Sequence, residues 1–183
     1  FHPTIDIQRN NEALKSHIES FSKGKEKKII LKGDLLHCDF GITYIGLNTD
    51  CQQHAYVLKD NENSVPTFLV DAFKKGNRVQ DILTSNMKVG KTGNQILKES
   101  LIQGRKEGFV PSIYTHPLGM FGHSAGTTIG MWDSQNGVPV NGDYPLHKNT
   151  VYAIELNTTV ALKEWNKNIR IMLEEAGFFG NNI

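Results

Sequence analysis

Residues Leu35–Asp50 read LLHCDFGITYIGLNTD, an apolar stretch with two aspartates, Asp39 and Asp50, eleven residues apart. The alternation of β-prone residues predicts a strand, a turn and a second strand. In a hairpin centred near Tyr44 and Ile45, the two aspartates would face each other with Cβ atoms about 5 Å apart. Two carboxylates about 4 Å apart near a protein surface repel by on the order of 4 kcal/mol. A shared proton, an arginine or a metal ion would offset that repulsion, unless one aspartate is only a polar residue at the end of the turn.

Composition and charge exclude several classes of protein. The chain has 183 residues, 38% hydrophobic and 21% charged, with a formal net charge of +1. This length suits one domain with a sizeable core. The balanced charge lacks the basic excess of a dedicated nucleic-acid binder, and no apolar run approaches the roughly 20 residues that span a bilayer. The two cysteines do not form a disulfide framework. The sequence opens at Phe1 without a signal-like segment, and we expect it to be a fragment.

The order of predicted elements indicates an α+β fold. Residues 1–7 alternate as in a strand, and the hairpin of residues 35–50 follows. Apolar residues at helical spacing predict one helix over residues 65–83 and a second over residues 92–106. From Phe109 onward the chain is rich in glycine and β-branched residues. Strands, then helices, then more strands are typical of an α+β domain.

Two further stretches carry chemistry. The glycine-rich turn THPLGMFGHSAG, Thr115–Gly126, holds His116 and His123 and could present both imidazoles in a cleft; alternatively, they are surface or satisfied core histidines. Glu155 interrupts the strand-like run TVYAIELN of residues 150–157, where an uncompensated charge is costly. With the two aspartates, these residues form an oxygen and nitrogen ligand set that suits Mn, Co, Zn or Fe(II).

The order and spacing of these motifs resemble the pita-bread metallopeptidases, which include the methionine aminopeptidases, aminopeptidase P and prolidase. The resemblance covers most of the chain from about Pro3 onward. It is carried by Asp39 and Asp50, the H-x-x-G-x-x-x-H pattern of His116 to His123, Ile154-Glu155, Lys32-Gly33-Asp34 and Lys91-Thr92-Gly93-Asn94. It implies an α+β pita-bread fold, a curved antiparallel sheet covered by helices with a metal site in its concave centre. Residues 1–183 would be the catalytic domain, incomplete at both ends.

The resemblance also implies roles for individual residues. Asp39, Asp50, His116 and Glu155 would bind two divalent metal ions, with Mn²⁺ favoured over Co²⁺ or Zn²⁺. Glu155 would also shuttle protons, and His123 would contact substrate or stabilise the tetrahedral intermediate.

Two assignments at the ends of the chain are looser. The stretch from Asn11 resembles a prolidase segment that ends in a substrate-binding histidine, here His17, although a surface histidine is the alternative. The family has a fifth ligand, a glutamate on a later strand. Glu174 and Glu175 follow the strand at Ile169 too early, so we expect this glutamate beyond Ile183.

The function expected from the resemblance is a metal-dependent exopeptidase. It would hydrolyse the N-terminal peptide bond of short peptides through a dinuclear metal-bound hydroxide. The HPLGMFGH form of residues 116–123, with the stretch ending at His17, favours Xaa-Pro substrates. We expect a cytoplasmic protein that forms a homodimer and binds neither nucleic acid nor membranes. The alternatives are methionine aminopeptidase-like activity, a catalytically inactive pita-bread binding module, and a mononuclear iron oxygenase.

Overall fold

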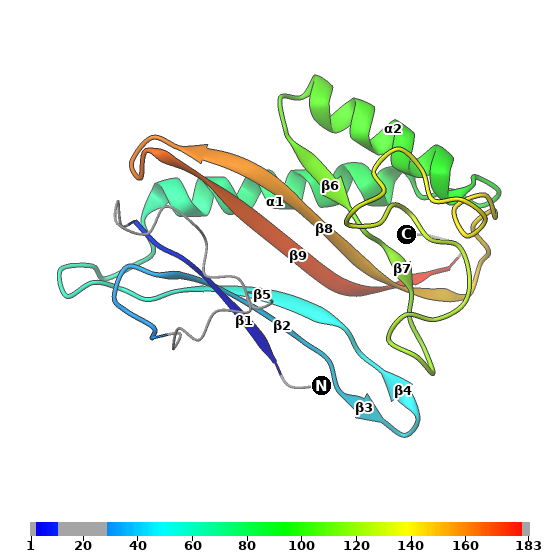
Figure 1. Cartoon of the computed structure of the whole chain (residues 1–183), viewed down its shortest axis with the longest axis horizontal. Coiled ribbons are helices and arrows are strands. Elements are labelled where there is room, and N and C mark those ends of the chain that lie inside the picture. The colour runs from blue at the N-terminus through cyan, green and yellow to red at the C-terminus, as the bar shows by residue number, and fades with distance from the viewer. Residues whose placement is uncertain (1–2, 11–28, 181–183) are drawn as a thin grey trace.

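The computed structural model describes residues 3–10 and 29–180 and contains a curved antiparallel sheet with helices on one side (Figure 1). In chain order the elements are β1 (Thr4–Gln8), β2 (Leu35–Phe40), β3 (Thr43–Tyr44), β4 (Leu47–Asn48), β5 (Cys51–Tyr56), α1 (Thr67–Asn86), α2 (Gly93–Lys106), β6 (Pro111–Ile113), β7 (His116–Pro117), β8 (Thr150–Leu162) and β9 (Lys167–Phe179). The main sheet has the order β1-β2-β5-β9-β8-β6, with β7 beside β8. The predicted α+β class, the curved sheet and both helices are confirmed.

The longest ladder of the sheet is the β8–β9 hairpin, in which thirteen residue pairs run from Thr150↔Phe179 to Leu162↔Lys167. Side chains alternate between the two faces of a strand. In β8 the face with Ile154 and Leu156 is buried, and the opposite face carries Glu155. The hairpin therefore separates an apolar face, which contacts the helices, from a face that can hold ligands.

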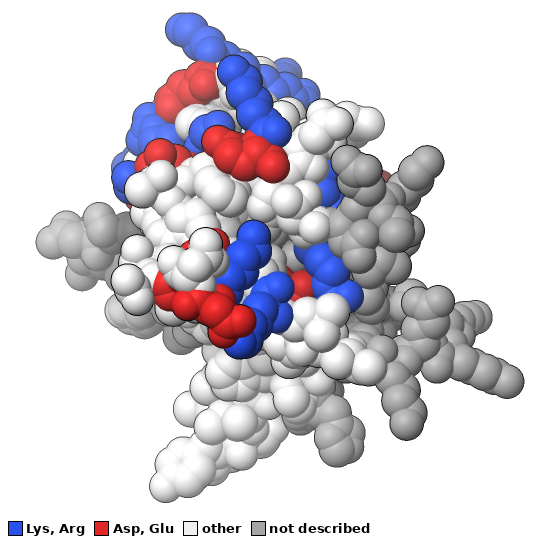
Figure 2. Space-filling model, turned by 90° about the vertical axis from the view of Figure 1, so that its left-hand side faces the viewer, with Lys and Arg blue, Asp and Glu red and all other residues white. Residues whose placement is uncertain are grey.

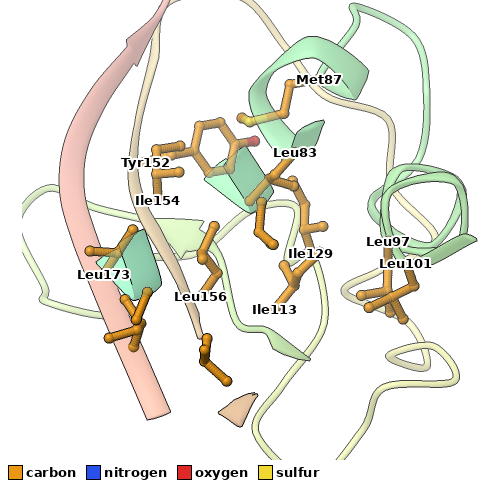
Figure 3. Close-up of a cluster of buried hydrophobic side chains, with 14 of the residues drawn as sticks. Leu83, Met87, Leu97, Leu101, Ile113, Ile129, Tyr152, Ile154, Leu156 and Leu173 are labelled. Carbon is orange, nitrogen blue, oxygen red and sulfur yellow. The ribbon is translucent and has the colours of Figure 1, made fainter. Parts of the chain in front are cut away.

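The helices bury the apolar face of this hairpin. Helix α1 comes close to β9 at Gly76, where an added Cβ would lie 2.6 Å from Ile171 Cγ2. Side chains from both helices, β6, β8 and β9 form the core (Figure 3). Helix α2 begins with a capping box, in which Thr92 accepts from the backbone of Gln95 and the Gln95 side chain accepts from the backbone of Thr92.

The register of the β2–β5 hairpin differs from the predicted one. Its turn is centred on Ile45-Gly46, both with positive φ (49° and 76°), and not on Tyr44-Ile45. A two-residue turn of this kind needs positive φ at both central positions, which Gly46 adopts without steric cost. Asp39 therefore pairs with Gln52 and not with Asp50.

We call the boundary between β5 and β9 the seam. It has a single residue pair, Gln52↔Glu174. Beyond that pair a side chain replaces a strand partner, because the backbone N–H of Met172 donates to His54 Nε2 at 3.0 Å. His54 Nδ1 donates to the carbonyl of Leu36 at 2.9 Å, so this imidazole links β9 to β2.

A second side chain completes the contact between the two parts of the sheet. The Gln8 amide on β1 donates to the carbonyl of Arg170 and accepts from its backbone N–H, both at 2.7 Å. The Gln8 amide and the His54 imidazole thus take the place of backbone groups where β9 has no strand partner on the side of β5. The two sides of the seam are held together mainly by side chains.

Basic and acidic side chains lie next to one another on the face shown in Figure 2. Ion pairs among the described residues include Arg78–Glu107 and Lys91–Glu99. Within residues 3–10 and 29–180, neither helix has the length and apolar character needed to cross a membrane.

Candidate metal centre

Five side chains converge at the seam from five segments of the chain. They are Asp39 near the end of β2, Asp50 immediately before β5, His116 at the start of β7, Glu155 in β8 and Glu174 in β9. The antiparallel register places Glu155 directly opposite Glu174. The structure thus brings together all four residues predicted as metal ligands and adds Glu174 to them.

The five residues form two overlapping groups, each of which could hold one metal ion. The ligand atoms of His116, Glu155 and Glu174 lie within 4.8 Å of one another, and so do those of Asp39, Asp50 and Glu174. Glu174 is common to both groups. A carboxylate has two oxygens, so Glu174 is placed to contact two ions at once.

His116 presents one ring nitrogen to this cluster. Its Nδ1 lies 3.2 Å from the carbonyl oxygen of Pro117, which can only accept, so Nδ1 carries the hydrogen. Nε2 then offers its lone pair toward the carboxylates, at 3.7 Å from Glu174, 3.8 Å from Glu155 and 4.0 Å from Asp50. Burial lowers the pKa of His116 to about 4, which keeps the imidazole neutral as a metal ligand must be.

The carboxyl groups are strongly perturbed. Burial raises the pKa of Glu174 to about 9 and that of Glu155 to about 8, and neighbouring carboxylates add to both shifts. Burial, followed by the charge of Asp39, raises the pKa of Asp50 to about 6. Among the described residues, no lysine or arginine contributes to these three shifts. An arginine therefore does not offset the repulsion predicted from the sequence, whereas bound cations would.

Two buried polar atoms of the cluster show whether a metal ion fits this site. His116 Nε2 and Glu174 Oε1 are buried and have no hydrogen-bond partner among the described residues. Leaving such groups unpaired is costly, and both belong to the cluster and point toward its other ligands. Carboxylate oxygens with one imidazole suit Mn²⁺, Co²⁺, Zn²⁺ or Fe²⁺. The residues present fit divalent ions.

His123 lies beside the cluster but is exposed. Its ring is tilted over that of His116, with centroids 4.1 Å apart, and its Nδ1 lies 2.9 Å from the hydroxyl of Tyr114. These two contacts fix the ring next to the site. His123 also lies within ligand distance of Asp50 and His116, so geometry alone allows it to bind a metal or to face a substrate.

A pocket of about 640 Å³ opens over the cluster. The side chains of Trp132 and Met172 give part of its wall an apolar character. Among the described residues that line it, Arg170 supplies the one guanidinium or ammonium group. The pocket therefore combines the carboxylates of the cluster with apolar and cationic side chains.

The position of the fifth carboxylate is corrected. It was expected beyond Ile183, but Glu174 already occupies the cluster, because the β8–β9 turn at residues 163–166 is short and aligns Glu174 with Glu155. Alternation in IRIMLEE, residues 169–175, was the signal, since it places Glu174 on the face opposite Ile171. His17 lies outside the described residues.

The sequence of the chain matches one protein-family model over most of its length. The model of metallopeptidase family M24 matches residues 1–175. The chain belongs to metallopeptidase family M24. The resemblance to pita-bread metallopeptidases is thereby confirmed. Comparison with curated proteins gives no significant match.

Solved structures share the fold of this M24 chain at low identity. The X-Pro aminopeptidase from Thermotoga maritima superposes with a TM-score of 0.65 and 19% identity, over 96% of this chain and 43% of that one. The prolidase from Pyrococcus furiosus gives 0.64 and 19%, over 100% and 47%. The N-terminal domain of the FACT complex subunit SPT16 from Cicer arietinum gives 0.62 and 10%, over 98% and 40%. The M24 chain thus spans less than half the length of these three.

Proposed function

We propose that this M24 chain is the catalytic part of a metal-dependent exopeptidase that removes the first residue of short Xaa-Pro peptides. The observation that carries the proposal is the pair of ligand groups that share Glu174. Four carboxylates, on Asp39, Asp50, Glu155 and Glu174, match the four positive charges of two divalent ions. The expected metals are Mn²⁺ first, then Co²⁺ or Zn²⁺.

Bound divalent ions would supply a water made acidic enough to act as a nucleophile near neutral pH, and would polarise the peptide carbonyl. The chain's own residues do the rest. Glu155, whose second oxygen faces His116, is placed to move a proton between this water and the leaving amine. His123, held by Tyr114, is placed beside the cluster to donate to the oxygen that becomes negative in the transition state.

The preference for short Xaa-Pro peptides rests on three features. The motif HPLGMFGH of residues 116–123 favours this branch of the family, and an X-Pro aminopeptidase and a prolidase are among the structures with this fold. The apolar wall formed by Trp132 and Met172 suits a proline ring. Arg170 can pair with the free carboxylate of a short peptide, since guanidinium matches carboxylate geometry.

The test combines metal analysis with hydrolysis. Protein prepared with Mn²⁺ should contain two ions per chain and release alanine from Ala-Pro. The same preparation should act more slowly on Met-Ala-Ser, and faster release of methionine would favour the methionine aminopeptidase alternative. A single iron per chain without hydrolysis would instead favour the oxygenase alternative.

A binding module with the same fold is the remaining alternative, since the SPT16 domain superposes almost as well as the peptidases. Because the fold does not separate the two functions, metal binding and hydrolysis must do so. Folded protein that binds no divalent metal and cleaves neither peptide would overturn the exopeptidase proposal and favour the binding-module alternative.

A further inference from the structure

Gln52 holds both glutamates of the metal centre through one amide group. It lies on β5, is buried, and forms the single residue pair of the seam with Glu174. Its Nε2 donates to Glu155 Oε1 at 2.9 Å and to Glu174 Oε2 at 3.0 Å. An amide nitrogen carries two hydrogens, so each carboxylate receives one. Both donor positions of this nitrogen are used on prospective metal ligands.

The remaining carboxylate oxygens face His116. Glu155 Oε2 lies 3.8 Å and Glu174 Oε1 lies 3.7 Å from His116 Nε2. Each glutamate therefore has one oxygen fixed by Gln52 and one directed toward the centre of the cluster. On the His116 side of the cluster, each glutamate therefore offers one oxygen to a metal ion.

The orientation of the Gln52 amide group follows from its contacts on both sides. A carboxylate that binds a metal ion is ionised and can only accept, so the amide nitrogen of Gln52 faces the glutamates and Oε1 faces the other way. There it lies 2.8 Å from His37 Nε2, which must carry a hydrogen to donate. The other ring nitrogen of His37 lies 3.0 Å from Asp6 Oδ2. A chain of polar contacts thus runs from β1 through β2 and β5 to the two glutamates.

We propose that Gln52, oriented by His37, is a positioning residue that sets Glu155 and Glu174 for metal binding. The inference rests on the proposed metal site. Outer partners of metal ligands fix the ligand's orientation and typically contribute 10–100-fold to affinity or activity. Gln52 serves two ligands at once, because the seam leaves its side chain between them.

The experiment compares Gln52→Met with Gln53→Met. Methionine keeps the length of the side chain but donates no hydrogen bond. Gln53 is the matched control, because its Nε2 donates to Glu175 Oε1 at 3.0 Å on the exposed, opposite face of the same strands. For each protein, Mn²⁺ affinity is measured by chelator competition, the Co²⁺ absorption spectrum reports ligand geometry, and Ala-Pro release gives kcat and KM.

Gln52→Met should weaken Mn²⁺ binding by about 10–100-fold and change the Co²⁺ spectrum, whereas Gln53→Met should match the unmodified protein in both. His37→Phe keeps Gln52 but removes the donor to its oxygen, and should give a smaller change of the same sign. The losses in the double variant should not add, because both residues act through one chain of contacts. If Gln52→Met fails to fold, His37→Phe still tests the proposal.

The outcomes separate the two claims. Unmodified protein that binds metal and cleaves Ala-Pro, with Gln52→Met or His37→Phe indistinguishable from it in affinity and spectrum, would overturn the role of Gln52 and leave the exopeptidase proposal intact. Unmodified protein that binds no divalent metal would overturn the proposed function, and with it the positioning role.

Discussion

The β8–β9 ladder and the seam between β5 and β9 are built in different ways. The ladder has thirteen residue pairs and a buried face against the helices. The seam has one pair, and elsewhere the side chains of Gln8 and His54 contact the backbone of β9. A continuous ladder uses its polar backbone groups within the sheet, whereas an open seam leaves space for side chains. The ladder therefore supplies rigidity, and the seam supplies the position for chemistry.

Glu174 belongs to both regions, and its replacement should have the largest effect. Glu174→Gln removes the oxygen charge shared by the two ligand groups while leaving the ladder pairing to Glu155 in place. We expect Ala-Pro hydrolysis to fall by more than about 10³-fold, because loss of an outer partner of a ligand alone costs 10–100-fold. Glu175→Gln, on the exposed face, is the control. Near-normal turnover by Glu174→Gln would mean that the two groups do not form one dinuclear site.

The two histidines beside the seam should respond differently. His116→Ala removes a buried ligand nitrogen, so metal content per chain should fall. His123→Ala should leave metal content close to normal and reduce kcat by about 10²–10³-fold if His123 donates to the oxyanion. Metal analysis and steady-state kinetics on both variants provide the check. Equal loss of metal from both would make His123 a ligand.

A substitution on the apolar face of the ladder tests whether the stability of the ladder is separable from metal binding at the seam. Ile171 is buried against α1, where it lies next to Gly76. Ile171→Ala should lower the free energy of unfolding by about 2–5 kcal/mol through lost burial and a cavity. Urea denaturation measures this loss. Mn²⁺ affinity at a temperature where the variant stays folded should not change, and a parallel loss of affinity would show that ladder and seam are not separable.

A further effect concerns the pH dependence of stability in the presence of a chelator. The pKa values of Asp50, Glu155 and Glu174 are raised in the folded chain, to about 6, 8 and 9. The metal-free folded chain therefore binds more protons than the unfolded chain between about pH 4.5 and 9. Their contribution to stability is present below that window and is lost as pH rises through it.

Glu174→Gln removes one of these titrating groups. Relative to it, the unmodified metal-free protein should lose stability with a slope of up to about 1.4 kcal/mol per pH unit between pH 5 and pH 9. Urea denaturation at several pH values measures both slopes. Parallel curves for the two proteins would show that Glu174 does not titrate in this window.

The sequence allowed the fold and most of the site to be predicted because the signals are local. Strand alternation and helical spacing identified the elements, and the resemblance to the pita-bread metallopeptidases implied the cluster of Asp39, Asp50, His116 and Glu155. The hairpin register was wrong by two residues because it depends on which pair of residues takes positive φ, and Gly46 decides that. Periodicity alone does not show the centre of a turn.

Glu174 and Gln52 were harder to assign because their roles depend on pairing between distant strands. Glu174 acquires its place from the short turn that aligns β9 with β8, and Gln52 from a contact with a strand 122 residues later. Neither residue belongs to a spacing motif. Their roles follow from which strand lies beside which, and the sequence of either strand alone does not contain that information.

The single backbone pair of the seam also has a consequence for the time course of folding. The β8–β9 hairpin is closed by residues 163–166, and hairpins of this kind form within about 1–10 μs. Gln52 and Glu174 are 122 residues apart, so their pairing requires closure of a long loop. The entropy cost of this closure comes before any favourable contact forms. We therefore expect the hairpin to form first and the ligand cluster last. In hydrogen exchange the amides of β5 should open more often than those of β8.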